Sequence, residues 1–253
     1  MIKMIMIGCN GHMGQVISGL VRDDPEAQIV AGIDVTDDRE NGYPVFTDIR
    51  KCDVPADVAI DFSAPQALDG VLEYCVGQQV PAVLCSTGLS ERQLAQISEA
   101  SKKVAVLKSA NMSLGINTLL HLIQEAAKVL AGAGFDMEVV EKHHRLKKDA
   151  PSGTALALAD SLNEAMGDAY HYVYDRSQKM QARDDKEIGL SAVRGGTIVG
   201  EHDVIFAGPD EVVTFSHTAY SKAVFGKGAV EAAKFLAGKP AGYYNMSDVI
   251  SGS

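Results

Sequence analysis

The sequence has no run of about 18 uninterrupted apolar residues, the length that a membrane-spanning helix requires. Its apolar N-terminal stretch, MIKMIMIG, is short, and it lacks the basic start and the small-residue cleavage site of a signal peptide. We therefore expect a cytoplasmic protein with no membrane partner.

Cysteine and positive charge are also scarce. The four cysteines do not form a CxxC pair, so we expect free thiols in a reducing compartment rather than a disulfide framework or a structural zinc site. The formal net charge is −10, whereas generic nucleic-acid binding depends on cationic charge that displaces counterions. The sequence therefore predicts no nucleic-acid partner.

What the chain does contain is the composition of a globular protein, with 46% hydrophobic and 22% charged residues over 253 positions. In the first hundred residues, short apolar runs alternate with helical patterns. Strands are expected at residues 2–7, 28–34, 58–62, 82–85 and 104–107, and helices at 13–22, 66–76 and 91–102. Such alternation predicts a Rossmann-like parallel sheet with helices on both faces.

The pattern changes after residue 111. We expect helices at 113–131, 154–165 and 227–236, a strand at 137–143, a polar loop at 175–187, and strands at 190–193, 203–206 and 212–217. The turns RGG and AGPDE between the last three strands predict antiparallel hairpins. The fold class is thus α/β, with a dinucleotide-binding domain at 1–111 and 225–253. Residues 112–224 form an α+β substrate-binding and oligomerisation domain with a mixed or antiparallel open sheet.

A glycine turn, GCNGHMG, follows the first strand directly. Gly8, Gly11 and Gly14 stand where backbone amides and a helix start can hold a pyrophosphate, and Asn10 suits a left-handed turn position. Asp34 closes the second strand 20 residues after Gly14, where an acidic side chain binds ribose hydroxyls. The competing interpretation is a turn that is merely structural.

Asp34 also bears on cofactor choice. A 2′-phosphate would favour a nearby arginine, but Val35 and Thr36 follow, and the next basic residue is Arg39. NADH is therefore expected as the preferred cofactor, with NADPH as the alternative should Arg39 or Lys51 fold back.

The segment EKHHRLKKDAPSGTALAL (residues 141–158) is unusual in an acidic chain, because six of the eight residues 142–149 are Lys, Arg or His. Ser152 or Thr154 is placed to cap the following helix, whose first amides attract anions. Together with Lys147 and a histidine, these groups predict a binding site for a small carboxylate.

Each element of this segment also has an ordinary interpretation, namely a solvated basic face, a plain helix cap, or histidines satisfied by local hydrogen bonds. A zinc site is disfavoured, because adjacent histidines with Glu141 lack the i, i+4 spacing of HExxH, and we expect no metal. A nucleic-acid patch is disfavoured as well, since no aromatic residue interleaves the basic ones.

EKHHRLKKDAPSGTA resembles the E-x-H-H-x-x-K-x-D-A-P-S-G-T-A signature of the 4-hydroxy-tetrahydrodipicolinate (dihydrodipicolinate) reductase family. GCNGHMG, DFSAP, SANMSLGIN, RGGTIVGEHDVIF and HTAYSKAVFGKGA resemble further family segments, in the same order along the chain. The chain departs from the family where Cys85-Ser86 replaces Gly-Thr, His12 and Lys222 each replace an arginine, and Met112 replaces a phenylalanine.

The resemblance implies the NAD(P)H-dependent reduction of a cyclic imine dicarboxylate in diaminopimelate and lysine biosynthesis, by a homotetramer whose domains close on the substrate. It implies that His143 is the proton donor and acceptor, that Lys147 is a proton donor, and that His144, Ser152, Gly153 and Thr154 bind substrate. The implied cofactor contacts are Gly8, Cys9, Asn10, Gly11, His12, Met13, Asp34, Cys85, Ser86, Thr87, Ser109, Ala110, Asn111 and Met112.

Two other functions fit parts of the sequence. Another NAD-dependent amino-acid or hydroxy-acid dehydrogenase would use the same glycine turn but would not need the whole His-His, Lys and Ser-Gly-Thr cluster. A nucleotide-sensing regulator would bind NADH without turnover, and it would expose a partner surface or a DNA-binding helix that the sequence does not suggest.

Overall fold

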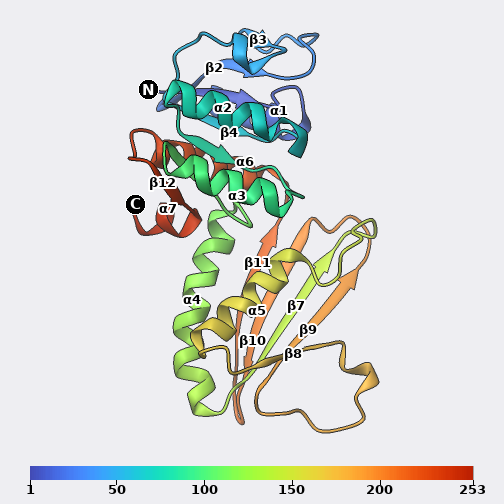
Figure 1. The fold of residues 1–253 in the computed structure, drawn as a ribbon. Coiled ribbons are helices and arrows are strands. Elements are labelled where there is room, and N and C mark those ends of the chain that lie inside the picture. Colours follow the sequence, from blue (N-terminus) through green and yellow to red (C-terminus); the bar gives the residue numbers. More distant parts are fainter. Residues whose placement is uncertain (253) are drawn as a thin grey trace. The chain divides into compact units, whose positions relative to one another are not determined.

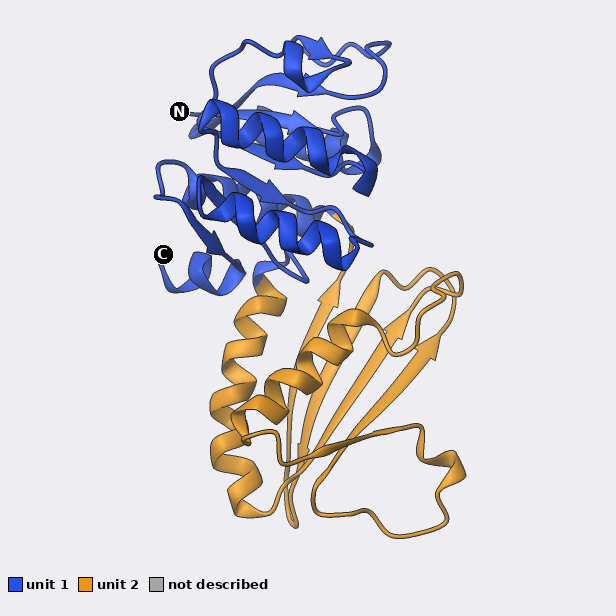
Figure 2. Ribbon diagram, in the orientation of Figure 1, with its two compact units in different colours: residues 1–114, 223–253 blue, residues 115–222 orange. Residues whose placement is uncertain are grey.

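A computed structural model of the chain describes residues 1–252. The chain divides into two compact units (Figure 2). Unit 1 comprises residues 1–114 and 223–253, and unit 2 comprises residues 115–222. The chain thus returns from residue 223 onward to the unit that contains its first 114 residues.

Unit 1 is a seven-stranded sheet with the order β12-β6-β5-β4-β1-β2-β3, and all its neighbouring strands are parallel. Its strands are β1 (Ile2–Ile7), β2 (Ala27–Ile33), β3 (Val45–Phe46), β4 (Val58–Asp61), β5 (Ala82–Leu84), β6 (Ala105–Lys108) and β12 (Gly242–Tyr244). Its helices are α1 (His12–Arg22), α2 (Leu68–Gln78), α3 (Glu91–Ser101), α6 (Ala223–Leu236) and α7 (Met246–Ser251), with short 3-10 turns at Ile49–Lys51 and Pro65–Ala67.

Both faces of this sheet are covered, which explains the continuous apolar runs of its strands. On β1, Met4 and Met6 pack in the cluster formed with α1, α6 and α7, whereas Ile5 and Ile7 pack in the cluster formed with α2 and α3. A strand with two buried faces needs no polar alternation. The expected doubly wound, Rossmann-like sheet is confirmed.

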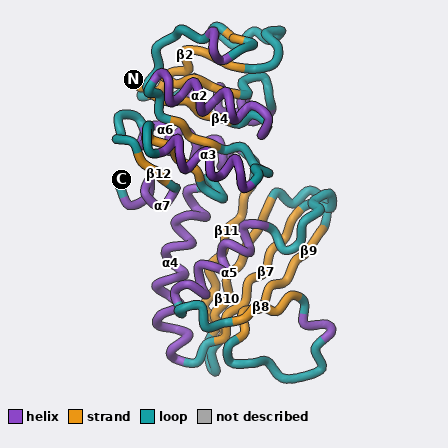
Figure 3. The backbone as a smooth tube through the Cα atoms, viewed as in Figure 1, coloured by secondary structure: helices purple, strands orange, loops and turns teal. Residues whose placement is uncertain are grey.

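Unit 2 is a five-stranded mixed sheet with the order β11-β10-β7-β9-β8. Its strands are β7 (Asp136–His143), β8 (His171–Tyr174), β9 (Glu187–Arg194), β10 (Gly200–Ala207) and β11 (Val212–Ala219). The helices α4 (Leu114–Leu130) and α5 (Gly153–Ala165) lie over one face (Figure 1), and the apolar residues of that face form a single core with them. The polar segment before β9 contains only a 3-10 turn, Arg176–Gln178, as Figure 3 shows in the lower part of the tube.

Neither helix of unit 2, residues 115–222, covers the opposite face of its sheet (Figure 1). It carries alternate residues of the central strands, including Val140 and Lys142 of β7 and Asp203 and Ile205 of β10, all half-buried. Lys142 forms ion pairs with Glu201 and Asp203 across this face. The face is therefore a mixture of apolar and paired charged side chains.

One of the two expected hairpins is wrong. The AGPDE turn joins β10 and β11 as an antiparallel hairpin, but β9 and β10 are not neighbours, because β7 lies between them. The glycines of RGG bond to the end of β7 instead: Gly195 N donates to His143 O, and Arg145 N donates to Gly196 O. The RGG segment is thus a connection across the end of β7, and it brings β9 and β10 to either side of that strand.

Candidate active site

The glycine turn of unit 1 has a geometry that only glycine permits at two positions. Gly8 has φ +81°, and a Cβ there would lie 2.9 Å from the Phe62 carbonyl oxygen. A Cβ on Gly14 would lie 2.2 Å from the Gly8 carbonyl oxygen, so α1 can start directly against the turn. Gly11 occupies the N-cap position of α1 with no side-chain cap, and this leaves the first helical amides to a ligand.

Asp34 lies beside this turn at the end of β2. Its Oδ2 accepts a hydrogen bond from Asn10 N at 2.7 Å, and its Oδ1 accepts one from Val35 N at 2.7 Å. Both bonds fix the carboxylate next to the turn, where a ribose would bind.

The expected left-handed conformation of Asn10 is wrong, since within residues 1–252 positive φ occurs outside glycine only at Gln79, Asp168 and Asp175. The side chain of Asn10 is used differently. It donates to the Thr36 carbonyl at 2.8 Å and accepts from Asn41 Nδ2 at 2.8 Å. Asn10 therefore ties the loop after β2 to the glycine turn.

A cavity of about 930 Å³ opens from the glycine turn and Asp34 within unit 1. Its size suits the adenosine part of a dinucleotide. The basic residue that lines it is Arg50, not Arg39 or Lys51, and Arg50 is engaged by Asp48 through two hydrogen bonds of 2.9 Å. The glycine turn, the ribose-type carboxylate and the cavity together fit a bound nicotinamide dinucleotide.

A second polar cluster lies where β4, β5 and β6 end. The buried Asp61 accepts hydrogen bonds from Ser63 N at 2.9 Å and from Ser86 Oγ at 3.1 Å, and burial raises the pKa of its carboxyl group. Lys108 Nζ donates to the Ser86 carbonyl at 3.1 Å, and Cys85 N donates to the Asp61 carbonyl at 2.9 Å. These bonds fix Cys85 and Ser86, two of the residues predicted to contact the cofactor.

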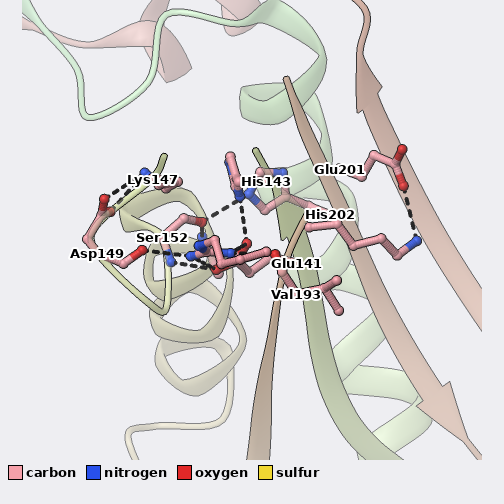
Figure 4. Close-up of polar contacts among 11 residues, drawn as sticks. Glu141, His143, Lys147, Asp149, Ser152, Val193, Glu201 and His202 are labelled. Carbon is pink, nitrogen blue, oxygen red and sulfur yellow. Dashed lines mark hydrogen bonds and ion pairs between the residues drawn. The ribbon is translucent and has the colours of Figure 1, made fainter. Parts of the chain in front are cut away.

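The polar site of unit 2 is built around Glu141, which is 1% exposed (Figure 4). Its Oε2 lies 2.6 Å from His143 Nδ1, two residues further along β7, and its Oε1 accepts from Ser152 N at 3.0 Å. Arg194 grips the same carboxylate with two bonds, Nη1 to Oε2 at 2.8 Å and Nη2 to Oε1 at 2.7 Å. Burial by itself would raise the pKa of Glu141, but the hydrogen bonds from Arg194, His143 and Ser152 hold it below its ordinary value.

Ser152 is the N-cap of α5. Its Oγ accepts a hydrogen bond from Ala155 N at 3.1 Å and also lies 3.1 Å from Nε2 of His202. The ring of His202 packs edge-on against His143 with a centroid separation of 5.1 Å. Burial, followed by the proximity of His143, lowers the pKa of His202 to about 4, so this imidazole is neutral near pH 7.

The remaining predicted residues of unit 2 lie in the turn after β7. Lys147 N donates to the His144 carbonyl at 3.1 Å, and Lys147 Nζ donates to Asp149 Oδ1 at 2.9 Å. Gly153 is exposed at the first position of α5, and Thr154 follows it half-buried. The predicted substrate residues are therefore all on one strand end, one turn and one helix start, and the predicted cofactor residues all lie in unit 1.

Three residues of the unit 2 site were missed as site residues in the sequence. In the sequence Glu141 stands out only as a disfavoured zinc ligand, and no local pattern singles out Arg194 or His202. The sheet brings these two into the site, because β9 and β10 flank β7 with Arg194 opposite His143 and His202 opposite Glu141. Both residues lie in RGGTIVGEHDVIF, and the resemblance of this segment to the family is the signal in the sequence that points to them.

The fold and the two polar sites define a two-domain, dinucleotide-dependent oxidoreductase. Within residues 1–252 no group of His, Cys, Asp or Glu side chains is arranged to hold a metal ion, and no helix has the length and apolarity to cross a membrane. Family models for the N-terminal and C-terminal parts of dihydrodipicolinate reductase match residues 2–112 and 115–250. The chain therefore belongs to the dihydrodipicolinate reductase family.

Individual proteins agree with this assignment. The chain is 51% identical over 250 residues to a 4-hydroxy-tetrahydrodipicolinate reductase of Caldanaerobacter subterraneus subsp. tengcongensis, covering 99% of this chain and 98% of the relative. It is 44% identical over 251 residues to the enzyme of the same name from Clostridium tetani, with the same coverage. Among solved structures, a dipicolinate-bound dihydrodipicolinate reductase from Paenisporosarcina sp. TG-14 superposes with a TM-score of 0.81 at 23% identity, covering 97% of both chains, and this likeness supports the fold.

Proposed function

We propose that the protein catalyses the NAD(P)H-dependent reduction of 4-hydroxy-tetrahydrodipicolinate to tetrahydrodipicolinate, in diaminopimelate and lysine biosynthesis. The observation that carries the proposal is that one buried carboxylate, that of Glu141, bonds both to His143 and to the backbone amide of Ser152. An acid/base group is thereby held next to a helix start that can bind a substrate carboxylate. The names of the two curated relatives described above point to the same reaction.

In the reaction that family membership implies, the ring hydroxyl leaves as water, a hydride adds to ring C4, and a proton adds at the neighbouring carbon. Bound reduced nicotinamide would supply the hydride. His143 is the proposed proton donor and acceptor, because an imidazole ring can both accept and donate a proton at its nitrogens. Lys147 is the proposed second proton donor, and its positive charge stabilises negative charge that develops on the ring.

The proposed substrate contacts are His144 and the capped turn Ser152-Gly153-Thr154. The start of α5, which Ser152 caps, presents the positive end of a helix to an anion. Two carboxylates on one small ring would satisfy both this turn and Lys147. A dicarboxylate therefore suits the site better than a neutral substrate.

For the cofactor, we propose a preference for NADH over NADPH. The Asp34 carboxylate is fixed beside the glycine turn, so a 2′-phosphate would bring negative charge against it. Arg50, the arginine of the cavity, is already paired with Asp48. The proposed cofactor contacts are Gly8, Cys9, Asn10, Gly11, His12, Met13, Asp34, Cys85, Ser86, Thr87, Ser109, Ala110, Asn111 and Met112.

We also propose a homotetramer that works in the cytoplasm. The helix-free face of the unit 2 sheet supports the assembly, because half-buried Val140 and Ile205 on this face would gain cover from a second copy. The four cysteines are free thiols, which suits a reducing compartment.

The test is a coupled assay in which the aldolase product is generated freshly and the oxidation of NADH is followed by absorbance. We expect turnover with this substrate and none with simple keto acids plus ammonia, which a general amino-acid dehydrogenase would accept. His143→Ala and Lys147→Ala should each lower turnover by about 10²-fold or more while NADH binding is retained. His171→Ala, an exposed histidine of β8, is the matched control and should behave like the wild type.

Three results would contradict the proposal. Absence of turnover with the aldolase product would show that the protein does not catalyse the proposed reaction. Wild-type rates in both site variants would remove the two residues from the chemistry. NADH binding without turnover on any substrate would favour a nucleotide-sensing protein instead.

A further inference from the structure

The Glu141 carboxylate is hydrogen-bonded to three residues, namely His143, Ser152 and Arg194. We propose that Glu141 is the positioning residue of the active site: it holds the His143 proton on Nδ1 and thereby presents Nε2 as the atom that exchanges a proton with the substrate. This inference rests on the proposed function, because it assumes that His143 transfers the proton.

The tautomer follows from the chemistry of the two partners. An ionised carboxylate can only accept hydrogen bonds, so His143 Nδ1, 2.6 Å from Glu141 Oε2, must carry a hydrogen. In the neutral imidazole the other nitrogen, Nε2, then has the free electron pair. When the ring is protonated, Nε2 carries the proton that can leave.

Arg194 keeps Glu141 in the state that this role requires. Its two bonds reach both carboxylate oxygens, so they oppose protonation of the carboxyl group and rotation of the side chain. Arg194 Nη2 also donates to the backbone carbonyl of Asp149 at 2.6 Å. The side chain of the same Asp149 accepts a hydrogen bond from Lys147 Nζ. Both proposed proton donors are thus held through one arginine–carboxylate pair.

The surroundings of Nε2 agree with this direction of transfer. A Cβ on Gly200 would lie 3.1 Å from His143 Nε2, so any side chain at that position would press on the reacting nitrogen. The neighbouring β10 residue on the same side, His202, has its Nε2 directed to Ser152 Oγ rather than to His143. Within residues 1–252, Nε2 of His143 therefore has no carboxylate partner of the kind that Nδ1 has.

A purely structural role makes different predictions. A buried ion pair between Glu141 and Arg194 would anchor β7 to β9 whatever the tautomer of His143, and losing it would lower stability and all activities together. A positioning role instead lowers the rate of the chemical step through His143 and leaves ligand binding nearly unchanged.

The first experiment is nitrogen NMR of the wild-type protein with labelled histidine, with the His143 signals assigned by their loss in His143→Ala. We expect the neutral ring to show a protonated Nδ1 and an unprotonated Nε2. The opposite tautomer would overturn the inference. This measurement needs neither turnover nor a folded Glu141 variant, so it judges Glu141 even if the proposed reaction is wrong.

The second experiment is a double-mutant cycle with Glu141→Gln and His143→Ala. The glutamine amide has one acceptor oxygen where the carboxylate has two, so it cannot accept hydrogen bonds from both His143 and Arg194 in the same way. We therefore expect kcat to fall about 10²-fold or more. The KM for substrate and the Kd for NADH should each change less than about threefold. In the His143→Ala background the same substitution should cause almost no further loss of kcat.

The matched control is Glu138→Gln, a substitution on the same strand as Glu141 that removes the charged partner of Arg183 without touching His143. It should keep wild-type kcat. A Glu141→Gln enzyme with wild-type kcat, or a full additional loss in the His143→Ala background, would contradict the positioning role. If His143→Ala itself keeps the wild-type rate, the proposed function of His143 fails, and the NMR result stands separately.

Discussion

His202 is expected to make unit 2 less stable as the solution becomes acidic. It is 4% exposed, and its pKa of about 4 in the folded chain compares with an ordinary value of 6.5. Burial is the main cause, and His143, His217 and Lys147 add repulsion, whereas Glu141 acts in the opposite sense. Between pH 6.5 and about 4, His202 therefore binds a proton in the unfolded chain but stays neutral in the folded chain.

The sign and the size of the effect follow from proton linkage. A depressed histidine pKa costs stability as the pH falls through the window from 6.5 to about 4, and over pH 7 to 4 this one group removes about 3 kcal/mol of unfolding free energy. His202→Gln keeps a donor that can reach Ser152 but does not titrate. Between pH 7 and pH 4 the unfolding free energy of the variant should therefore fall by about 3 kcal/mol less than that of the wild type.

The assay is urea unfolding at each pH, with circular dichroism as the probe, because the chain has no tryptophan for fluorescence. Only the change in unfolding free energy with pH is compared, so a constant offset from the substitution does not matter. Carboxylates elsewhere titrate equally in both proteins and cancel. Equal pH dependence of the wild type and His202→Gln would refute the reasoning.

Three further outcomes are expected. Gly14→Ala should cost about 1–3 kcal/mol of stability and weaken NADH binding, because its methyl group would lie 2.2 Å from the Gly8 carbonyl oxygen. Gly19→Ala, on the same helix, has open space for a methyl group and should be tolerated. Calorimetry and NADH titration of the two variants would check both outcomes. Asp34→Ala should lower the NADH-to-NADPH ratio of kcat/KM roughly tenfold, through loss of a charged acceptor for the ribose, and an unchanged ratio would count against the cofactor proposal. Ile205→Glu should convert the proposed tetramer into smaller species by light scattering, and an unchanged mass would remove this sheet face from the interface.

Much of unit 1 could be predicted from the sequence because its signals are local. The run Ile2–Ile7 is a strand with those bounds, and the periodic helices fall within a few residues of their predicted ends. The short strands β3 and β12 were not predicted, because segments of two or three residues carry no periodicity.

Unit 2 was harder to predict because its order depends on a crossover. Local turn chemistry at RGG favoured a hairpin, but α5 and β8 carry the chain to the far side of β7, and β9 then pairs parallel with it. The same long-range pairing explains why Glu141, Arg194 and His202 were missed. They are up to 61 residues apart in the sequence and meet only through the register of three strands.

The most direct test of the central claim is a crystal structure of the protein with NADH and pyridine-2,6-dicarboxylate, a planar mimic of the substrate. We expect one carboxylate on the turn Ser152-Gly153-Thr154, Lys147 near the other, and His143 Nε2 facing the ring. A ring bound away from residues 143–154 would contradict the account.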